Sequence, residues 1–233
     1  MSTFIDVDVP CDVCGKITER TVATSINATR APEYRQAVLD GAFQRFLCSR
    51  CGVESTPLVP FVYLDFDRGI YIGVFPSSDE ATWWAVEEEP LTAFDRNLGA
   101  QAPPPARGIG SHFQVRTVFG LTALREKIVV LEAGLDDAVL ETLKLRLMAV
   151  MSDLSLDLAG RVRLVTVTPS QLVFLVPQGS ADGQRQLEVP RADYDDVAAD
   201  DVLRAGFVRH FEAGPYRDAG RLLRPAPTLT WAD

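Results

Sequence analysis

Histidine is nearly absent from this chain of 233 residues, which contains only His112 and His210. A Ser-His-Asp or Cys-His nucleophile would need one of these two residues as its general base. No nucleophile elbow or related motif surrounds either histidine, so we interpret both as incidental surface or boundary residues. The sequence therefore predicts no catalytic residue.

Long hydrophobic runs are also missing. No apolar stretch reaches the roughly 20 residues that a transmembrane helix requires. Residues 1–8 are acidic and lack the basic and apolar regions of a signal peptide. We therefore expect a cytoplasmic protein without a membrane partner, in a compartment that keeps thiols reduced.

Basic residues are outnumbered, and few of them are lysine. Only Lys16, Lys127 and Lys144 accompany the arginines, which we interpret as the bias of a GC-rich genome. The net charge is −9, and residues 1–98 hold eight Lys or Arg against fifteen Asp or Glu, a net of −7. Because nucleic-acid binding depends on basic residues that neutralise phosphates, this distribution argues against nucleic acid. We expect another protein as the partner and leave the oligomeric state open.

The four cysteines form two matched pairs, each followed by a glycine, Gly15 or Gly52. Four thiolates in two close pairs are the ligands of a tetrahedral structural zinc ion. In such a knuckle, backbone N–H groups point at a sulfur atom, and the residue after the turn often has a positive φ, which glycine adopts without penalty. The predicted ligands of one Zn²⁺ are Cys11, Cys14, Cys48 and Cys51.

Two disulfides or a redox dithiol are the alternatives to zinc. A redox Cys-x-x-Cys usually occurs as a single pair at a helix start in a thioredoxin-like fold. Two matched pairs and the lack of a secretion signal favour metal. A site with four thiolates has no open coordination position, so we expect the zinc to be structural and not catalytic.

Hydrophobic periodicity predicts an α+β fold that begins with a zinc-ribbon-like module carrying an inserted helix. The elements predicted for this module are strands over 4–9 and 17–26, a helix over 32–39 that ends at Gly41, a hairpin over 58–64 and 70–75, and a helix over 91–98.

The second part of the chain is predicted to be a helical segment followed by a small antiparallel sheet. Residues 99–111, which include three consecutive prolines, predict a linker, so the domains are a zinc-ribbon module over 1–98 and an α+β unit over 112–233. The elements predicted for this unit are helices over 121–131 and 136–151, a meander of strands over 161–168, 171–176 and 184–189, and a helix over 193–205 that ends at Gly206.

The adjacent Trp83 and Trp84 would face opposite ways in a strand, so one of them should be exposed. We interpret them as packing between the two parts of the chain, with an external partner as the alternative. The acidic runs over 87–89 and 193–201 are interpreted as solvated faces. The fragment over 108–110 lacks the third glycine and the preceding strand of a phosphate loop, so no cofactor-binding residue is predicted.

Several segments beyond the cysteines carry a resemblance to a known family. They are Ser25-Ile-Asn-Ala28, Gly41-Ala-Phe43, Tyr63-Leu-Asp65, Val74-Phe-Pro76, Phe119-Gly-Leu121, Leu124-Arg-Glu-Lys127 and Gly134-Leu-Asp-Asp137. Through them, residues 4–150 resemble the CpXC family of bacterial and archaeal proteins. The family is named for Cys-Pro-x-Cys, whereas Asp12 and Ser49 occupy the proline positions of this chain. Proline is not a ligand, so the resemblance still implies a zinc-binding module, and it implies no reaction.

These observations favour a non-enzymatic zinc-binding protein that interacts with another protein. The alternative is an enzyme whose carboxylates and arginines form a site in a cleft between the two parts of the chain. A nucleic-acid-binding regulator is the least favoured hypothesis, because the zinc module is acidic.

Overall fold

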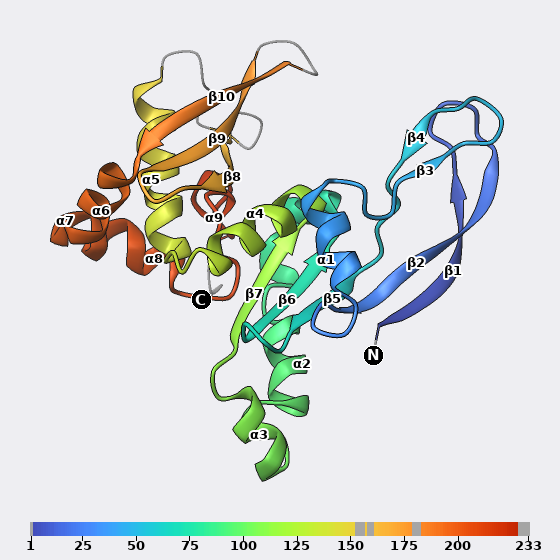
Figure 1. Ribbon diagram of the computed structural model, residues 1–233, viewed down its shortest axis with the longest axis horizontal. Coiled ribbons are helices and arrows are strands. Elements are labelled where there is room, and N and C mark those ends of the chain that lie inside the picture. The colour runs from blue at the N-terminus through green and yellow to red at the C-terminus, as the bar shows by residue number, and fades with distance from the viewer. Residues whose placement is uncertain (1, 152–156, 158–160, 179–182, 228–233) are drawn as a thin grey trace, which may run out of the picture. The chain divides into compact units, whose positions relative to one another are not determined.

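The computed structural model describes residues 2–151, 157, 161–178 and 183–227 (Figure 1). The chain forms two compact units, Met1–Asp79 with Glu89–Arg125 and Glu80–Glu88 with Glu126–Asp233. Both units combine helices and sheets, so the predicted α+β class is confirmed. Within the described ranges, no helix has both the length and the apolar character needed to span a bilayer.

A mixed five-stranded sheet organises the first unit, in the order β1-β2-β5-β6-β7. The strands are β1 (Thr3–Pro10), β2 (Ile17–Asn27), β5 (Phe61–Asp65), β6 (Ile70–Phe75) and β7 (Gln114–Phe119). β1–β2 and β5–β6 are antiparallel hairpins, while β2–β5 and β6–β7 are parallel pairs. Two short strands, β3 (Phe46–Leu47) and β4 (Glu54–Ser55), form a separate antiparallel pair.

Strand β6 lies between β5 and β7 and is buried on both faces. On one face, Phe61 of the neighbouring β5 contacts Phe43, which follows α1 (Pro32–Leu39). On the other face, α2 (Glu89–Asn97) packs so closely that a Cβ atom at Gly73 would collide with the ring of Pro90. Helices on both sides explain why β6 reads as a continuous apolar run.

The compact units do not follow the predicted division at residues 99–111. These residues lie within the first unit, and part of them forms the helix α3 (Pro104–Gly110). Proline suits the first turn of a helix, where its missing N–H group has no intrahelical partner, so a proline run can start a helix as well as a linker. Strand β7 then completes the sheet, although the sequence pattern did not predict it.

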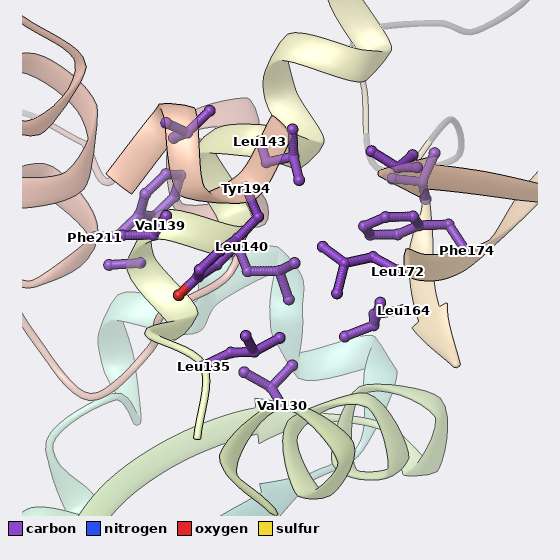
Figure 2. Packing of buried hydrophobic residues seen from close by; sticks show 14 of the residues in the cluster. Val130, Leu135, Val139, Leu140, Leu143, Leu164, Leu172, Phe174, Tyr194 and Phe211 are labelled. Carbon is purple, nitrogen blue, oxygen red and sulfur yellow. The ribbon is translucent and has the colours of Figure 1, made fainter. Parts of the chain in front are cut away.

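The second unit packs helices against an antiparallel meander in the order β10-β9-β8. Its elements are α4 (Leu121–Glu132, which begins in the first unit), α5 (Asp137–Val150), β8 (Arg163–Val167), β9 (Gln171–Gln178), β10 (Gly183–Pro190), α6 (Arg191–Ala199), α7 (Asp201–Leu203), η2 (Arg204–Val208), α8 (Arg209–Phe211) and α9 (Gly220–Leu223). Figure 2 shows Leu140 and Leu143 of α5 facing Leu172 and Phe174 of β9 in the core. The predicted meander and both predicted helices before it are present.

The single helix predicted over 193–205 is wrong. The chain breaks at Asp200, which has extended backbone angles and whose carboxylate accepts the N–H groups of Val202 and Leu203. An aspartate that caps a new helix competes with continuation of the preceding one. Gly206, predicted to follow the helix, lies inside the π-helical turn η2.

Trp83 and Trp84 lie in a 3₁₀ helix, η1 (Ser77–Ala85), and not in a strand. Trp83 is 4% exposed, and its indole N–H donates a 2.7 Å hydrogen bond to the carbonyl oxygen of Arg224. Its ring lies 5.3 Å from that of Tyr216 and below the guanidinium of Arg221. Trp83 thus packs against residues of the predicted C-terminal part, but residues 80–88 belong to the second unit, so this packing lies within one unit and not between two. Trp84 is half-buried, so the exposure predicted for one of the two tryptophans is not found. The final tryptophan, Trp231, lies outside the described residues.

Candidate metal centre

The first cysteine pair lies in the turn that joins β1 to β2. Cys11 and Lys16 flank this turn, and the Cys11 N–H donates to the Lys16 carbonyl at 3.0 Å. Within the turn, the N–H of Gly15 donates to the Cys11 carbonyl at 2.8 Å. Gly15 has a φ of +68°, the left-handed conformation predicted for the glycine of a knuckle.

The second pair repeats this geometry between β3 and β4. The N–H of Cys48 donates to the Val53 carbonyl, and the N–H of Gly52 donates to the Cys48 carbonyl, both at 2.8 Å. Gly52 has a φ of +71°. The two turns are therefore equivalent knuckles, each closing a short hairpin.

The knuckles bring all four sulfur atoms together, with every pair within 4.8 Å. The Sγ atoms of Cys11 and Cys51 are 3.6 Å apart, as are those of Cys14 and Cys48. Four sulfurs around a metal at about 2.3 Å would lie about 3.8 Å apart, whereas a disulfide requires about 2.05 Å. All four cysteines are free thiols, and their arrangement fits a metal ion and not a pair of disulfides.

Backbone N–H groups favour a thiolate at the first cysteine of each knuckle. Those of Cys14 and Val13 lower the pKa of Cys11, and those of Arg50 and Cys51 lower the pKa of Cys48 to about 6.

The second cysteines behave oppositely. The backbone N–H of Lys16 lowers the pKa of Cys14, but burial and hydrogen bonds to neighbouring thiols outweigh it and raise this pKa to about 12. The backbone N–H of Val53 lowers the pKa of Cys51, but burial and hydrogen bonds to neighbouring thiols again raise this pKa overall. Each 3.6 Å sulfur pair therefore joins a favoured thiolate to a thiol, and a bound cation would replace the remaining protons.

A protein-family model described as "CpXC protein" matches residues 9–144, more than half of the chain. The chain belongs to the CpXC family. The match covers both knuckles and extends through the first part of α5, so the resemblance inferred from the sequence is confirmed. No curated protein and no solved structure matches the chain.

In this CpXC protein, two basic residues hold the knuckles together. Lys16, directly after Gly15, donates a 2.7 Å hydrogen bond from Nζ to the Ser49 hydroxyl of the other knuckle. Arg20 of β2 donates to the carbonyl of Leu47 at 2.7 Å and lies over the ring of Phe46 in β3. Neither role was predicted from the sequence; the place of Lys16 beside a Cys-x-x-Cys-Gly motif was the available signal.

The remaining candidate residues lie outside the metal centre. His112 and His210 are exposed, as predicted for incidental residues. The acidic residues over 193–201 are exposed too. The expectation of a solvated face is wrong for Glu87, which is buried and forms an ion pair with Arg221 of α9.

A second group of charged residues, which we call the ion network, is buried inside the second unit. At its centre Lys144 of α5 is 0% exposed, and its ammonium binds Glu126 of α4 at 3.0 and 3.2 Å and Glu141 at 2.9 Å. The other members are Glu80, Glu87, Lys127, Asp137, Arg161, Arg163, Arg217, Asp218 and Arg221. Six carboxylates thus face six cations among the described residues.

Three of these carboxylates, on Glu126, Glu141 and Asp218, lie within 4.8 Å of one another. The ammonium of Lys144 and the guanidinium of Arg163 already bind them, so protein cations take the place of a metal. Burial, which the attraction of Lys144 only partly offsets, raises the pKa of Glu141 to about 7. Arg161, Arg163 and Lys144 overcome burial at Asp218 and hold its pKa well below the usual range.

The ion network was not predicted from the sequence, because its members come from five separate segments. In the sequence, Lys127 and Lys144 were noted only as two of the few lysines of an arginine-rich composition. The signal that could have found them is their position: both stand on faces of α4 and α5 that also carry the buried apolar residues.

Proposed function

We propose that this CpXC protein binds one zinc ion through Cys11, Cys14, Cys48 and Cys51, as a zinc-ribbon-like module. The observation that supports this proposal is the cluster of four thiols on two equivalent knuckles, with sulfur spacing close to that of a tetrahedral site. The site joins two hairpins separated by the helix α1, so binding energy would be folding energy for the first unit.

Elemental analysis of the protein, purified without added metal, tests this proposal. We expect one equivalent of zinc, its loss in Cys14→Ser, and its retention in Asp12→Asn, which alters a non-ligand residue of the same knuckle. An iron-loaded site would be coloured, because sulfur-ligated iron absorbs visible light, whereas zinc is colourless. Disulfides detected by mass spectrometry, or well under half an equivalent of zinc, would contradict the proposal.

We further propose that the protein is a non-enzymatic interaction module whose partner is another protein. Four thiolates leave no open coordination position for an activated water. Residues 1–98 carry a net charge of −7, and one zinc ion would offset only two of the four thiolate charges. A phosphate backbone would meet repulsion at this surface, whereas a partner with a basic patch would be attracted.

Affinity purification from the native cell at low salt tests the second proposal. A protein partner should co-purify in stoichiometric amount and should dissociate as salt rises, because screening weakens the attraction. Micromolar or tighter binding to mixed-sequence DNA or RNA at physiological salt would overturn the proposal in favour of a nucleic-acid-binding regulator.

An enzyme that uses carboxylates and arginines is the second candidate, and the ion network is the observation that favours it. The carboxylates of the ion network, however, are buried and bind Lys144, Arg161 and Arg163. This pairing supports a role of the ion network in stability and not in catalysis. A small-molecule library screened by thermal shift separates the two roles. A ligand that stabilises the wild type but not Glu141→Gln would support the enzyme.

A further inference from the structure

The outer edge of β1 offers backbone groups to a partner. β1 is the first strand of the five-stranded sheet, and in the described part of the chain only β2 pairs with it (Figure 1). Phe4 is 38% exposed and Ile5 is 45% exposed, although both are large apolar residues. A strand edge of this kind is a template for pairing with another chain.

We propose that β1 binds an extended segment of another protein by strand addition, and that this segment carries Lys or Arg at alternate positions. The inference rests on the proposed function as an interaction module, and it names the surface and the chemistry of the partner. Strand addition supplies affinity through backbone hydrogen bonds and specificity through alternate side chains.

The ladder between β1 and β2 identifies the residues that face the outer edge. The hydrogen bond from the Cys11 N–H to the Lys16 carbonyl makes these two residues a hydrogen-bonded pair. Hydrogen-bonded and non-hydrogen-bonded pairs alternate along an antiparallel ladder. Counting back from Cys11, the backbone groups of Phe4, Asp6 and Asp8 therefore point away from β2.

The same residues carry the charges that select a cationic partner. Asp8 lies directly opposite Glu19 of β2, in a non-hydrogen-bonded pair, where side chains approach most closely. Like charges in this arrangement are destabilising, and both residues are exposed. Asp6 lies on the same face and accepts a 2.7 Å hydrogen bond from the Thr21 hydroxyl. An incoming cation beside Asp8 would relieve the repulsion, and a second cation two residues away would reach Asp6.

A second copy of this chain fits the edge poorly. Pairing β1 with β1 of another copy would bring Asp6 and Asp8 next to the same two carboxylates, which is unfavourable. Charge complementarity therefore favours a basic strand from another protein.

A synthetic peptide tests the proposal with the full-length zinc-loaded protein. The probe is a capped seven-residue peptide in which lysine and valine alternate, and the control peptide has the same residues in two blocks. We expect the alternating peptide to shift the NMR amide signals of Phe4, Asp6 and Asp8 and to slow their hydrogen exchange. Methylating the backbone nitrogens that face β1 should abolish binding, since those groups can no longer donate.

Two isosteric double variants locate the site. Asp6→Asn/Asp8→Asn should weaken binding of the alternating peptide by about tenfold, the combined effect of two cross-strand ion pairs. Asp193→Asn/Asp196→Asn removes the same charge from exposed positions on α6 and should leave the affinity unchanged. Equal losses in both variants, or equal binding of both peptides, would show non-specific attraction and overturn the proposal.

Three further outcomes would also overturn it. If no peptide binds, the carboxylates only protect the edge from pairing. If sedimentation shows a dimer that the peptide dissociates, β1 pairs with a second copy. If the native partner binds Asp6→Asn/Asp8→Asn as tightly as wild type, the partner docks elsewhere and the proposed function still stands. The zinc measurement tests the proposed function separately.

Discussion

Replacing Lys144 by methionine should strongly destabilise the second unit. Methionine keeps nearly the volume of the side chain, with one heavy atom fewer, but removes an ammonium that is fully buried between Glu126 and Glu141. Taking one partner out of a buried ion pair typically costs about 3–5 kcal/mol, because the remaining charge has lost its compensation. That is a large fraction of the roughly 5–15 kcal/mol by which a domain is stable.

The two carboxylates should not share this loss equally. Glu126 keeps the Arg163 guanidinium at 2.6 Å and the Leu164 N–H at 2.7 Å. Among the described hydrogen bonds, Glu141 keeps only the Ala219 N–H, at 2.7 Å. Most of the cost therefore falls on Glu141, and neutralising it should recover stability. We expect Lys144→Met/Glu141→Gln to be more stable than Lys144→Met by about 1.5 kcal/mol or more, within the range of coupled neighbours.

Urea denaturation followed by tryptophan fluorescence measures these differences, because Trp83 packs inside the second unit. Arg146→Met is the matched control, since Arg146 is an exposed cation on the same helix and should change stability by less than about 0.5 kcal/mol. A cost of less than about 1 kcal/mol for Lys144→Met would contradict this prediction. So would simple addition of the effects of Lys144→Met and Glu141→Gln on the free energy of unfolding.

Three further predictions concern the metal centre and the response to pH. Cys14→Ser or a strong chelator should melt β1, β2 and both knuckles, while the Trp83 fluorescence of the second unit persists. A single unchanged thermal transition after verified metal removal would contradict this prediction. Gly52→Ala should destabilise the first unit by about 1–2 kcal/mol in the same denaturation assay, because the φ of Gly52 is +71° and no atom obstructs a Cβ there. Gly108→Ala in α3 is the control: φ is not positive there and the space is also open, so this change should be neutral or stabilising. The folded pKa of Glu141, about 7, exceeds its unfolded value, so this residue binds a proton on folding between about pH 4.5 and 7. Its contribution to stability should therefore fall as pH rises through that window. Glu141→Gln should remove this pH dependence, and identical pH profiles of stability for the two proteins would contradict the prediction. The lowered pKa of Asp218 acts in the opposite sense, since its stabilisation is present above its unfolded pKa and is lost as pH falls toward the folded value.

Local patterns in the sequence predicted the elements whose causes are local. The helix Pro32–Leu39 follows from its proline and the glycine after it, and Gly41 has the expected positive φ. The cysteine knuckles were predictable for the same reason, because spacing and glycine determine the turn. Strand β7 was not predicted, because a six-residue strand is stabilised by its parallel neighbour β6 and not by its own pattern. Helix α3 was not predicted, because its proline run indicated a linker.

The sequence by itself determined the four-cysteine site, the α+β class and the family of this protein. Each depends on residues close together in the chain or on periodicities of two and 3.6 residues. Only the tertiary structure decided that Lys16 bridges the knuckles, that Lys144 lies between buried carboxylates and that the Phe4, Asp6 and Asp8 backbone faces an open edge. The sequence around a charged residue does not distinguish a solvated face from a buried ion pair. Only the fold brings its distant partners within the few ångströms over which an ion pair forms.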